Sequence, residues 1–315
     1  RPPFQPLRTN QRLRCLTDEQ LGQLQETTLR MLEEIGVRFP SHKALAVLSD
    51  HGARVDHKTE IVRFPRDLVF KALSTCPRYF PLGGRDPALD LQLQDGVTYF
   101  TNDGCGVETI DFETRQRRAS CKDDVGKMAR VADYLSSISF VWPIVSAQDY
   151  GKTAPLHEMD ACWNNTVKHV QSETIMGEAP CRYAVEMAIV IAGSREQVRR
   201  RPPFSLVVCT IAPLTQDTDG IEGAMVLAEA GVPVGFLAMP TMGTTAPATL
   251  AGALALADAE IISAAVLMQL VSPGTPVFHS EMHAWADPRS GAYVSYPLDS
   301  RGRFAPVEMA HHWGL

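Results

Sequence analysis

Extended apolar segments alternate with helical segments along most of the chain, and this repetition is the strongest constraint on its fold. Parallel strands need crossover connections, which are usually helices, so a repeated strand-then-helix pattern predicts a parallel sheet. The strand segments are nearly continuous in Val, Ile and Phe, as expected for strands buried on both faces. The predicted strands are 97–103, 137–147, 168–176, 205–213, 233–242 and 276–286, and a helical segment follows each of the first five.

The spacing of these units predicts an α/β fold with a (β/α)8 TIM-type barrel over residues 96–315. The units recur at about 30 to 40 residues, which suits such a barrel. No glycine-rich dinucleotide turn follows a strand, which disfavours a Rossmann fold. Eight units would need roughly 80 to 100 more residues, so we expect the C-terminal strands to be missing from this chain. An open curved sheet is the alternative, but it would expose an apolar edge.

Residues 1–95 are predicted to form a mainly helical region with one small hairpin. Thr17 and Gln20 have the spacing of a capping box, in which each side chain bonds the other residue's backbone N–H. The helix that starts there is expected to end at Gly36. The other predicted elements are a helix over 41–51, a hairpin over 53–64 and a helix from Pro65 to Pro77.

Composition and charge exclude several classes of function. The chain has 30 Lys and Arg against 36 Asp and Glu, a net charge of -6, which argues against a nucleic-acid-binding protein. Seven cysteines occur without a CxxC pair, which disfavours a thiolate zinc site and predicts a reducing, cytoplasmic location. No membrane span is predicted, because Asp258 and Glu260 interrupt the most apolar segment, 249–271. Self-association as a homo-oligomer is expected, and this segment could supply the interface, although burial inside the protein is favoured.

Functional residues of a barrel lie at the C-terminal ends of its strands, so polar residues there are candidates. His279, Glu281 and His283 lie two residues apart in the sixth strand and should share one face. Three interpretations compete: a metal site, a site that orients substrate or transfers protons, and a satisfied hydrogen-bond network. We favour the second, with Glu281 and His283 as catalytic groups and His279 as a substrate-binding group, and we assign no metal ligands.

Other candidates lie at the ends of the remaining strands. Asp103 and Glu173 follow the first and third strands, where a buried carboxylate often has a role. Trp142, Phe236 and Trp285 belong to the second, fifth and sixth strands. Aromatic residues there are most often part of the core, but a cluster facing the barrel mouth could form a cage for a quaternary ammonium group. We therefore predict all five as substrate-binding residues.

Four segments of the chain are similar to the trimethylamine methyltransferase family of corrinoid-dependent amine methyltransferases. They are 28–39, 64–77, 239–278 and 289–296, and the third is the most specific. The resemblance implies a (β/α)8 barrel with an N-terminal helical region. It also implies transfer of a methyl group from a methylated amine to the cobalt of a partner corrinoid protein. Family members are longer than this chain, and residues 297–315 match less smoothly.

The resemblance also bears on the substrate. The founding members use trimethylamine and carry pyrrolysine near the sixth strand, where Ser280 to Trp285 of this chain are ordinary residues. The branch without pyrrolysine includes glycine betaine methyltransferases. A quaternary amine is already activated, because its leaving group departs as a neutral tertiary amine. The resemblance therefore implies a quaternary amine, glycine betaine or a related betaine, as methyl donor to cobalt(I).

In this interpretation a histidine meets the betaine carboxylate and carboxylates surround its cation. His279 or His283 would serve the first purpose, and Glu281, Glu173 or Asp103 the second. Two rivals remain: a metal-dependent barrel lyase or hydrolase, and a non-catalytic barrel that binds a small molecule.

Overall fold

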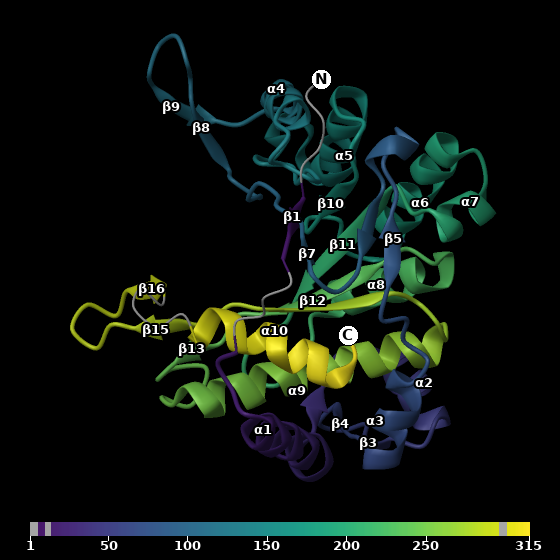
Figure 1. The fold of residues 1–315 in the computed structure, drawn as a ribbon, viewed down its shortest axis with the longest axis vertical. Helices are drawn as coiled ribbons and strands as arrows, with labels where there is room; N and C mark the ends of the chain where they lie inside the picture. The colour runs from purple at the N-terminus through teal and green to yellow at the C-terminus, as the bar shows by residue number, and fades with distance from the viewer. Residues whose placement is uncertain (1–5, 10–13, 296–300) are drawn as a thin grey trace. The chain divides into compact units, whose positions relative to one another are not determined.

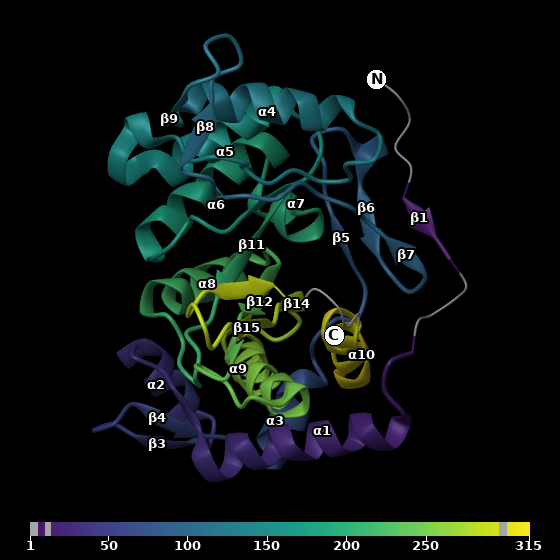
Figure 2. The ribbon, with the colours of Figure 1, turned by 90° about the vertical axis from the view of Figure 1, so that its left-hand side faces the viewer.

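The computed structural model describes residues 6–9, 14–295 and 301–315. It confirms a mixed α/β architecture with parallel strand pairs. The chain forms two compact units (Figures 1 and 2). Unit 1 comprises residues 1–12, 79–207 and 230–233, and unit 2 comprises residues 13–78, 208–229 and 234–315. This division cuts across the boundary predicted near residue 95, and the predicted division into a helical region and a barrel stays a prediction.

Unit 1 contains helices stacked around short parallel segments. Strand β10 pairs in parallel with β11, with Val170 opposite Phe204. Antiparallel pairs join β1 to β7, β5 to β6 and β8 to β9. The elements are β1 (Leu7–Arg8), β5 (Phe80–Leu82), β6 (Leu91–Leu93), β7 (Val97–Thr98), β8 (Glu108–Ile110), β9 (Arg117–Ala119), α4 (Lys122–Tyr134), α5 (Ala154–Asn165), β10 (Val170–Ser172), α6 (Glu178–Ala192), α7 (Arg195–Arg200) and β11 (Phe204–Cys209), with 3-10 turns at Pro87–Leu89 and Gln148–Thr153.

The first two predicted strands of the barrel are not continuous strands, which corrects the expectation for 97–103 and 137–147. Only Val97–Thr98 forms a strand, and the rest pairs through isolated bridges such as Thr101 to Phe140 and Val141 to Val170. Pro143 has no N–H for a ladder, and its carbonyl accepts from the Cys105 N–H. The segments nevertheless run parallel and adjacent in chain order, as the barrel requires.

Unit 2 packs a long helix beneath a second parallel pair. Strand β12 pairs in parallel with β14, which places Phe236 opposite His279. The elements are α1 (Asp18–Arg30), a π-helical turn (Met31–Ile35), β2 (Val37–Arg38), α2 (His42–Asp50), β3 (Arg54–Asp56), β4 (Ile61–Arg63), α3 (Arg66–Leu73), α8 (Thr218–Ala230), β12 (Val234–Ala238), β13 (Thr241–Met242), α9 (Leu250–Val271), β14 (Val277–Glu281), β15 (Ala284–Ala286), β16 (Tyr293–Ser295) and α10 (Arg301–Trp313).

Helix α9 is the centre of unit 2. It lies between strand β12 and helix α1 in both views (Figures 1 and 2), and it also packs on α3, β14 and α10. Its residues from Ala253 to Gln269 are buried on all sides, including Asp258 and Glu260. By length and composition α9 could cross a membrane, and it is the one such helix in the described part of the chain. However, 83% of its most apolar window is buried, as in the core helix of a folded domain.

Local signals predicted the N-terminal elements well. Both bonds of the capping box form: the Gln20 N–H donates to Thr17 Oγ1 at 3.2 Å, and the Thr17 N–H donates to Gln20 Oε1 at 2.9 Å. Gly36 ends this helical segment with a φ of 89°, and a Cβ there would lie 2.5 Å from the Val62 carbonyl oxygen. The hairpin is β3 paired with β4. The third helix ends at Leu73, before the predicted stop at Pro77.

The predicted sixth strand is interrupted. It forms β14 up to Glu281, and its second half, β15, pairs instead with β13 and β16. Helix α10 follows and packs on β14, which completes a sixth strand-helix unit. The weakly matching segment begins at residue 297, and its residues 297–300 lie outside the described residues.

Candidate functional site

The predicted site residues fall in both units. Asp103, Trp142 and Glu173 belong to unit 1, and the remaining five belong to unit 2: Phe236, His279, Glu281, His283 and Trp285. The predicted aromatic cage would combine residues of the two, and its assembly stays a prediction.

In unit 1, the side chain of Asn102 holds the backbone of Trp142. The Trp142 N–H donates to Asn102 Oδ1 at 3.2 Å, and Asn102 Nδ2 donates to the Trp142 carbonyl at 2.8 Å. The indole lies against Gly104, where an added Cβ would approach Trp142 Cε3 to 2.9 Å. The position of Trp142 therefore depends on the amide side chain of Asn102 and on the lack of any side chain at Gly104.

A buried hydrogen-bond chain continues from the indole. Trp142 Nε1 donates to Gln171 Oε1, Gln171 Nε2 lies 3.0 Å from Ser205 Oγ, and Ser205 Oγ lies 2.9 Å from His169 Nε2. His169 Nδ1 lies 3.1 Å from the Gly83 carbonyl oxygen, which can only accept. His169 therefore donates from Nδ1 and accepts at Nε2 from the Ser205 hydroxyl, and Ser205 accepts from Gln171. Burial lowers the pKa of His169 to about 4, which keeps the ring neutral in this role.

The two predicted carboxylates of unit 1 differ in exposure. Asp103 is exposed, and its Oδ1 accepts from the Gly104 N–H at 2.9 Å. Glu173 is half-buried and follows strand β10. Glu173 therefore lies at a strand end and is the more shielded of the two, whereas Asp103 follows a segment that pairs only through the isolated bridge at Thr101.

Sequence reasoning missed Glu158 of helix α5, which is only 1% exposed. It accepts from Ser146 Oγ at 2.7 Å and from Thr174 Oγ1 at 2.6 Å. Ser146 directly follows the isolated bridge between Gly106 and Val145, and Thr174 lies in the loop after strand β10. One buried carboxylate thus joins two loops at the C-terminal end of the sheet. Its burial could not be read from the sequence, because Glu158 lies in a helix of mixed polarity.

In unit 2, His279 faces the helices that cover the sheet. His279 Nε2 lies 3.0 Å from Asp258 Oδ1 of helix α9. Asp258 also accepts from Thr28 Oγ1 of α1 at 2.7 Å and from Trp313 Nε1 of α10 at 2.9 Å. Phe236 is fully buried on the same face, because the β12–β14 register sets it opposite His279. The parallel register places Phe236 and His279 on a common face, and this face is the one that α9 covers.

Glu281 and His283 form a second buried polar group. Their side chains are fully buried and in contact, and burial raises the pKa of Glu281. Both carboxylate oxygens of Glu281 and both ring nitrogens of His283 nevertheless lack a hydrogen bond of good geometry within the described residues. Buried polar groups without partners are costly, so such groups need an explanation. Strand β14 ends at Glu281, so His283 reaches it across the break in the strand.

Glu260 has a role in unit 2 like that of Glu158 in unit 1. It lies on α9, accepts from Thr210 Oγ1, and accepts from the Leu214 N–H at 2.7 Å. Both donors lie in the loop after β11. Burial raises the pKa of Glu260 to about 7, and the nearby Glu281 adds to the increase. The signal for Asp258 and Glu260 was present in the sequence, since they are the two acids within the apolar segment 249–271.

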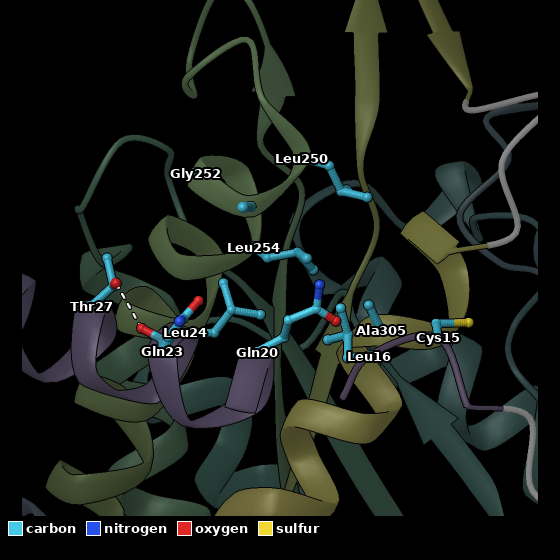
Figure 3. A pocket seen from close by; sticks show the side chains of 11 residues that line it. Cys15, Leu16, Gln20, Gln23, Leu24, Thr27, Leu250, Gly252, Leu254 and Ala305 are labelled. Atoms are coloured by element: carbon cyan, nitrogen blue, oxygen red, sulfur yellow. Dashed lines mark hydrogen bonds between the residues drawn. The ribbon is translucent and has the colours of Figure 1, made fainter. Parts of the chain in front are cut away.

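Trp285 and one pocket of unit 2 lie apart from these polar groups. Trp285 lies on β15 and is 37% exposed. A cavity of about 470 Å³ opens between α1, α9 and α10, and side chains of α1 and α9 line it from opposite sides (Figure 3). No predicted site residue contributes to this pocket. Its lining is Cys15, Leu16, Gln20, Gln23, Leu24, Thr27, Leu250, Ala251, Gly252, Leu254 and Ala305.

Within residues 6–9, 14–295 and 301–315, no group of three or more His, Cys, Asp or Glu side chains is arranged to hold a metal ion. The Asp258–His279 and Glu281–His283 pairs nevertheless influence each other, because the charges of His279 and Asp258 both act on Glu281.

Comparison with known proteins identifies the family. Residues 4–315 match the profile of trimethylamine methyltransferase (MTTB). The chain belongs to this family. It is 36% identical over 264 residues to a trimethylamine methyltransferase MttB of Desulfitobacterium hafniense, covering 84% of this chain and 53% of that protein. It is 30% identical over 309 residues to MttB2 of Methanosarcina mazei, covering 96% of this chain and 62% of that protein.

A glycine betaine methyltransferase of Desulfitobacterium hafniense is 27% identical over 317 residues, covering 95% of this chain and 62% of that protein. The chain therefore spans between half and two thirds of the length of these relatives. These matches confirm the family resemblance that the sequence analysis predicted.

Proposed function

We propose that this family member is a methyltransferase that moves a methyl group from a quaternary amine, glycine betaine or a related betaine, to cobalt(I) of a partner corrinoid protein. Membership of a methyltransferase family carries the reaction class. The founding members have pyrrolysine in the region that corresponds to Ser280–Trp285, whereas this chain has only ordinary residues there. This difference supports a quaternary amine as the substrate. The parallel strands in chain order support a (β/α)8 barrel as the scaffold.

The chemistry asks the protein mainly to position its substrate. The carbon–nitrogen bond of one methyl group breaks, nitrogen keeps the bonding electron pair, and the acceptor supplies the pair for the new bond to carbon. No proton moves, so no general base is needed. The protein must align the methyl group with the acceptor and exclude water, and an aromatic face can hold the cation in a dry site.

Trp142 is the aromatic residue best supported for that purpose, since its backbone, ring and indole N–H are each fixed within unit 1. Glu173 and Asp103 are proposed to face the cation from the adjacent strand ends. The roles proposed for Phe236 and His279 in binding rest on their burial in β12 and β14. Those proposed for Glu281 and His283 in catalysis rest on their burial at the end of β14 and just after it. The role proposed for Trp285 in binding rests on its position in β15.

Trimethylamine is a second candidate substrate. The relative of 36% identity carries the name of a trimethylamine methyltransferase, whereas the glycine betaine methyltransferase is 27% identical. Both candidates are methylated amines, so one assay separates them.

The test is methyl transfer from glycine betaine or trimethylamine to cob(I)alamin by the purified protein, together with calorimetric titration of each amine. We expect transfer from glycine betaine and not from trimethylamine. Trp142→Ala should weaken glycine betaine binding by about 5- to 20-fold, since it removes a cation–π contact. Phe112→Ala is the matched control, because Phe112 is 79% exposed on the β8–β9 hairpin. Transfer from trimethylamine alone would favour the second candidate, and transfer from neither would refute both.

The cytoplasmic location and self-association expected from the sequence remain part of this proposal. In the described part of the chain, none of the cysteines forms a disulfide, which is compatible with a reducing compartment.

A further inference from the structure

The ring of Trp142 is held by a hydrogen bond from its indole N–H. Phe236 has no polar atom in its ring, and Trp285 is partly exposed on β15. The Trp142 indole N–H is instead bonded to Gln171, which is 6% exposed and lies on strand β10. The two residues are 29 positions apart in sequence and meet because Val141 bridges Val170 in parallel.

The orientation of the Gln171 amide is fixed by the groups behind it. Ser205 gives its only proton to His169 Nε2, because His169 Nδ1 donates to the Gly83 carbonyl. Ser205 Oγ can then only accept from Gln171, so the amide nitrogen faces Ser205 and the amide oxygen faces Trp142. A rotated amide would set two donors against each other at Trp142.

We propose that Gln171 is a positioning residue for Trp142, and that the chain of Gln171, Ser205 and His169 sets the plane in which the indole meets a cationic substrate. This inference rests on the proposed function for its ligand, a quaternary ammonium group. Gln171 touches no substrate and acts through the ring. Without its oxygen, the indole N–H would be left half-buried and unpaired, and the ring would turn toward water to regain a partner.

The effect on kinetics follows from where the charge lies. The cation is complete in the bound ground state and is lost as the methyl group leaves. A misplaced aromatic face therefore weakens substrate binding more than it slows the chemical step, and it raises KM while kcat changes less. A residue that only stabilises the fold would lower the fraction of active protein, and hence kcat, at constant KM.

The experiment compares Gln171→Met with Gln269→Met in the purified protein. Gln269 is 2% exposed in unit 2 and forms hydrogen bonds with Gly274 and Thr275. Gln269→Met therefore also removes a buried, hydrogen-bonded amide, but one that does not contact Trp142. The readouts are the indole N–H resonances of ¹⁵N-tryptophan protein, with Trp142→Phe for assignment, and KM and kcat for glycine betaine. We expect Gln171→Met to shift the Trp142 resonance and to raise KM about 5- to 20-fold with kcat within about 3-fold. Gln269→Met should leave both KM and that resonance unchanged.

Two further variants keep the test decisive. Gln171→Glu retains an acceptor oxygen and should return the Trp142 resonance toward its original position. Should Gln171→Met fail to fold, Ser205→Ala frees the amide to rotate and should shift the same resonance by a smaller amount. An unmoved Trp142 resonance, or a fall in kcat at constant KM, overturns the inference. If the unchanged protein binds no methylated amine, the proposed function fails, whereas the resonance still reports whether Gln171 orients the ring.

Discussion

Asp258 shows how one residue can organise a whole unit. Its carboxylate is fully buried and accepts bonds from Thr28 of α1, His279 of β14 and Trp313 of α10. A buried acceptor with three donors is satisfied. The residue that interrupts the apolar character of α9 is therefore the point at which three other elements attach to it.

Removal of this carboxylate should be costly. We expect Asp258→Ala to lower the free energy of unfolding by about 3 kcal/mol, because three buried donors lose their acceptor. Thr28→Val removes one donor and fills its place with a methyl group, so it should cost about 1 kcal/mol or less. Urea denaturation measures both. Asp123→Ala, at an exposed ion pair with Lys127, is the control and should change stability by no more than about 0.5 kcal/mol. A loss for Asp258→Ala as small as the control's would contradict the role assigned to it.

At the scale of elements, the β12–β14 pair depends on a glycine. Gly235 lies opposite Phe278 in the parallel register, and a Cβ on Gly235 would lie 1.9 Å from Phe278 Cε2. The phenyl ring therefore covers the strand where the side chain is missing. This contact is on the face opposite to the one that carries Phe236 and His279. One face of the pair is therefore covered by the Phe278 ring over Gly235, and the other by the side chains of Phe236 and His279.

Two glycine substitutions should therefore have opposite effects. Gly235→Ala forces the Phe278 ring to move and should destabilise the protein by about 1 to 3 kcal/mol. Gly22→Ala lies within α1 with nothing inside 4 Å of the new Cβ, and it should stabilise the protein by about 0.5 to 1 kcal/mol. Chemical denaturation of the two variants gives the comparison. Equal changes of the same sign would mean that the ring does not rest on Gly235.

The elements also show what the sequence could predict. Helices with a strong local signal, such as the capped α1 and the continuously apolar α9, were predicted to within a few residues, because those signals are local. The segments around Pro143 look like strands in composition, but their hydrogen bonds depend on neighbours far away in sequence. Trp142 was predicted as a site residue because it belongs to the predicted second strand, whereas its partner Gln171 depends on the register between two segments. Alternation likewise joined His279 to Glu281 without indicating which face α9 covers.

At the scale of the whole molecule, the two units should respond to pH in opposite directions. His169 in unit 1 is buried and neutral, with a pKa of about 4 against an ordinary value of 6.5. Its contribution to stability is present above about pH 6.5 and is lost as the pH falls toward 4. Glu260 in unit 2 has a pKa of about 7 against an ordinary value of 4.5. Its contribution is present below about pH 4.5 and is lost as the pH rises through 7. Asp90 near His169 opposes the first shift, and Glu281 near Glu260 reinforces the second.

Variants that do not titrate should reveal the two slopes separately. As pH rises from 5 to 7.5, Glu260 is expected to lower the free energy of unfolding of unit 2 by about 2 kcal/mol. Over the same range, His169 is expected to raise the free energy of unfolding of unit 1 by about 2 kcal/mol. Urea unfolding across this range should therefore show Glu260→Gln gaining stability over the unchanged protein as pH rises. His169→Asn should gain over it as pH falls, since the asparagine is not protonated there. For each variant, the difference in free energy of unfolding from the unchanged protein is plotted against pH, and the two plots should have opposite slopes. The reason is that burial disfavours the charged form of both groups, which is the deprotonated form of Glu260 and the protonated form of His169. Parallel slopes would mean that at least one of these side chains is accessible to water in the folded protein.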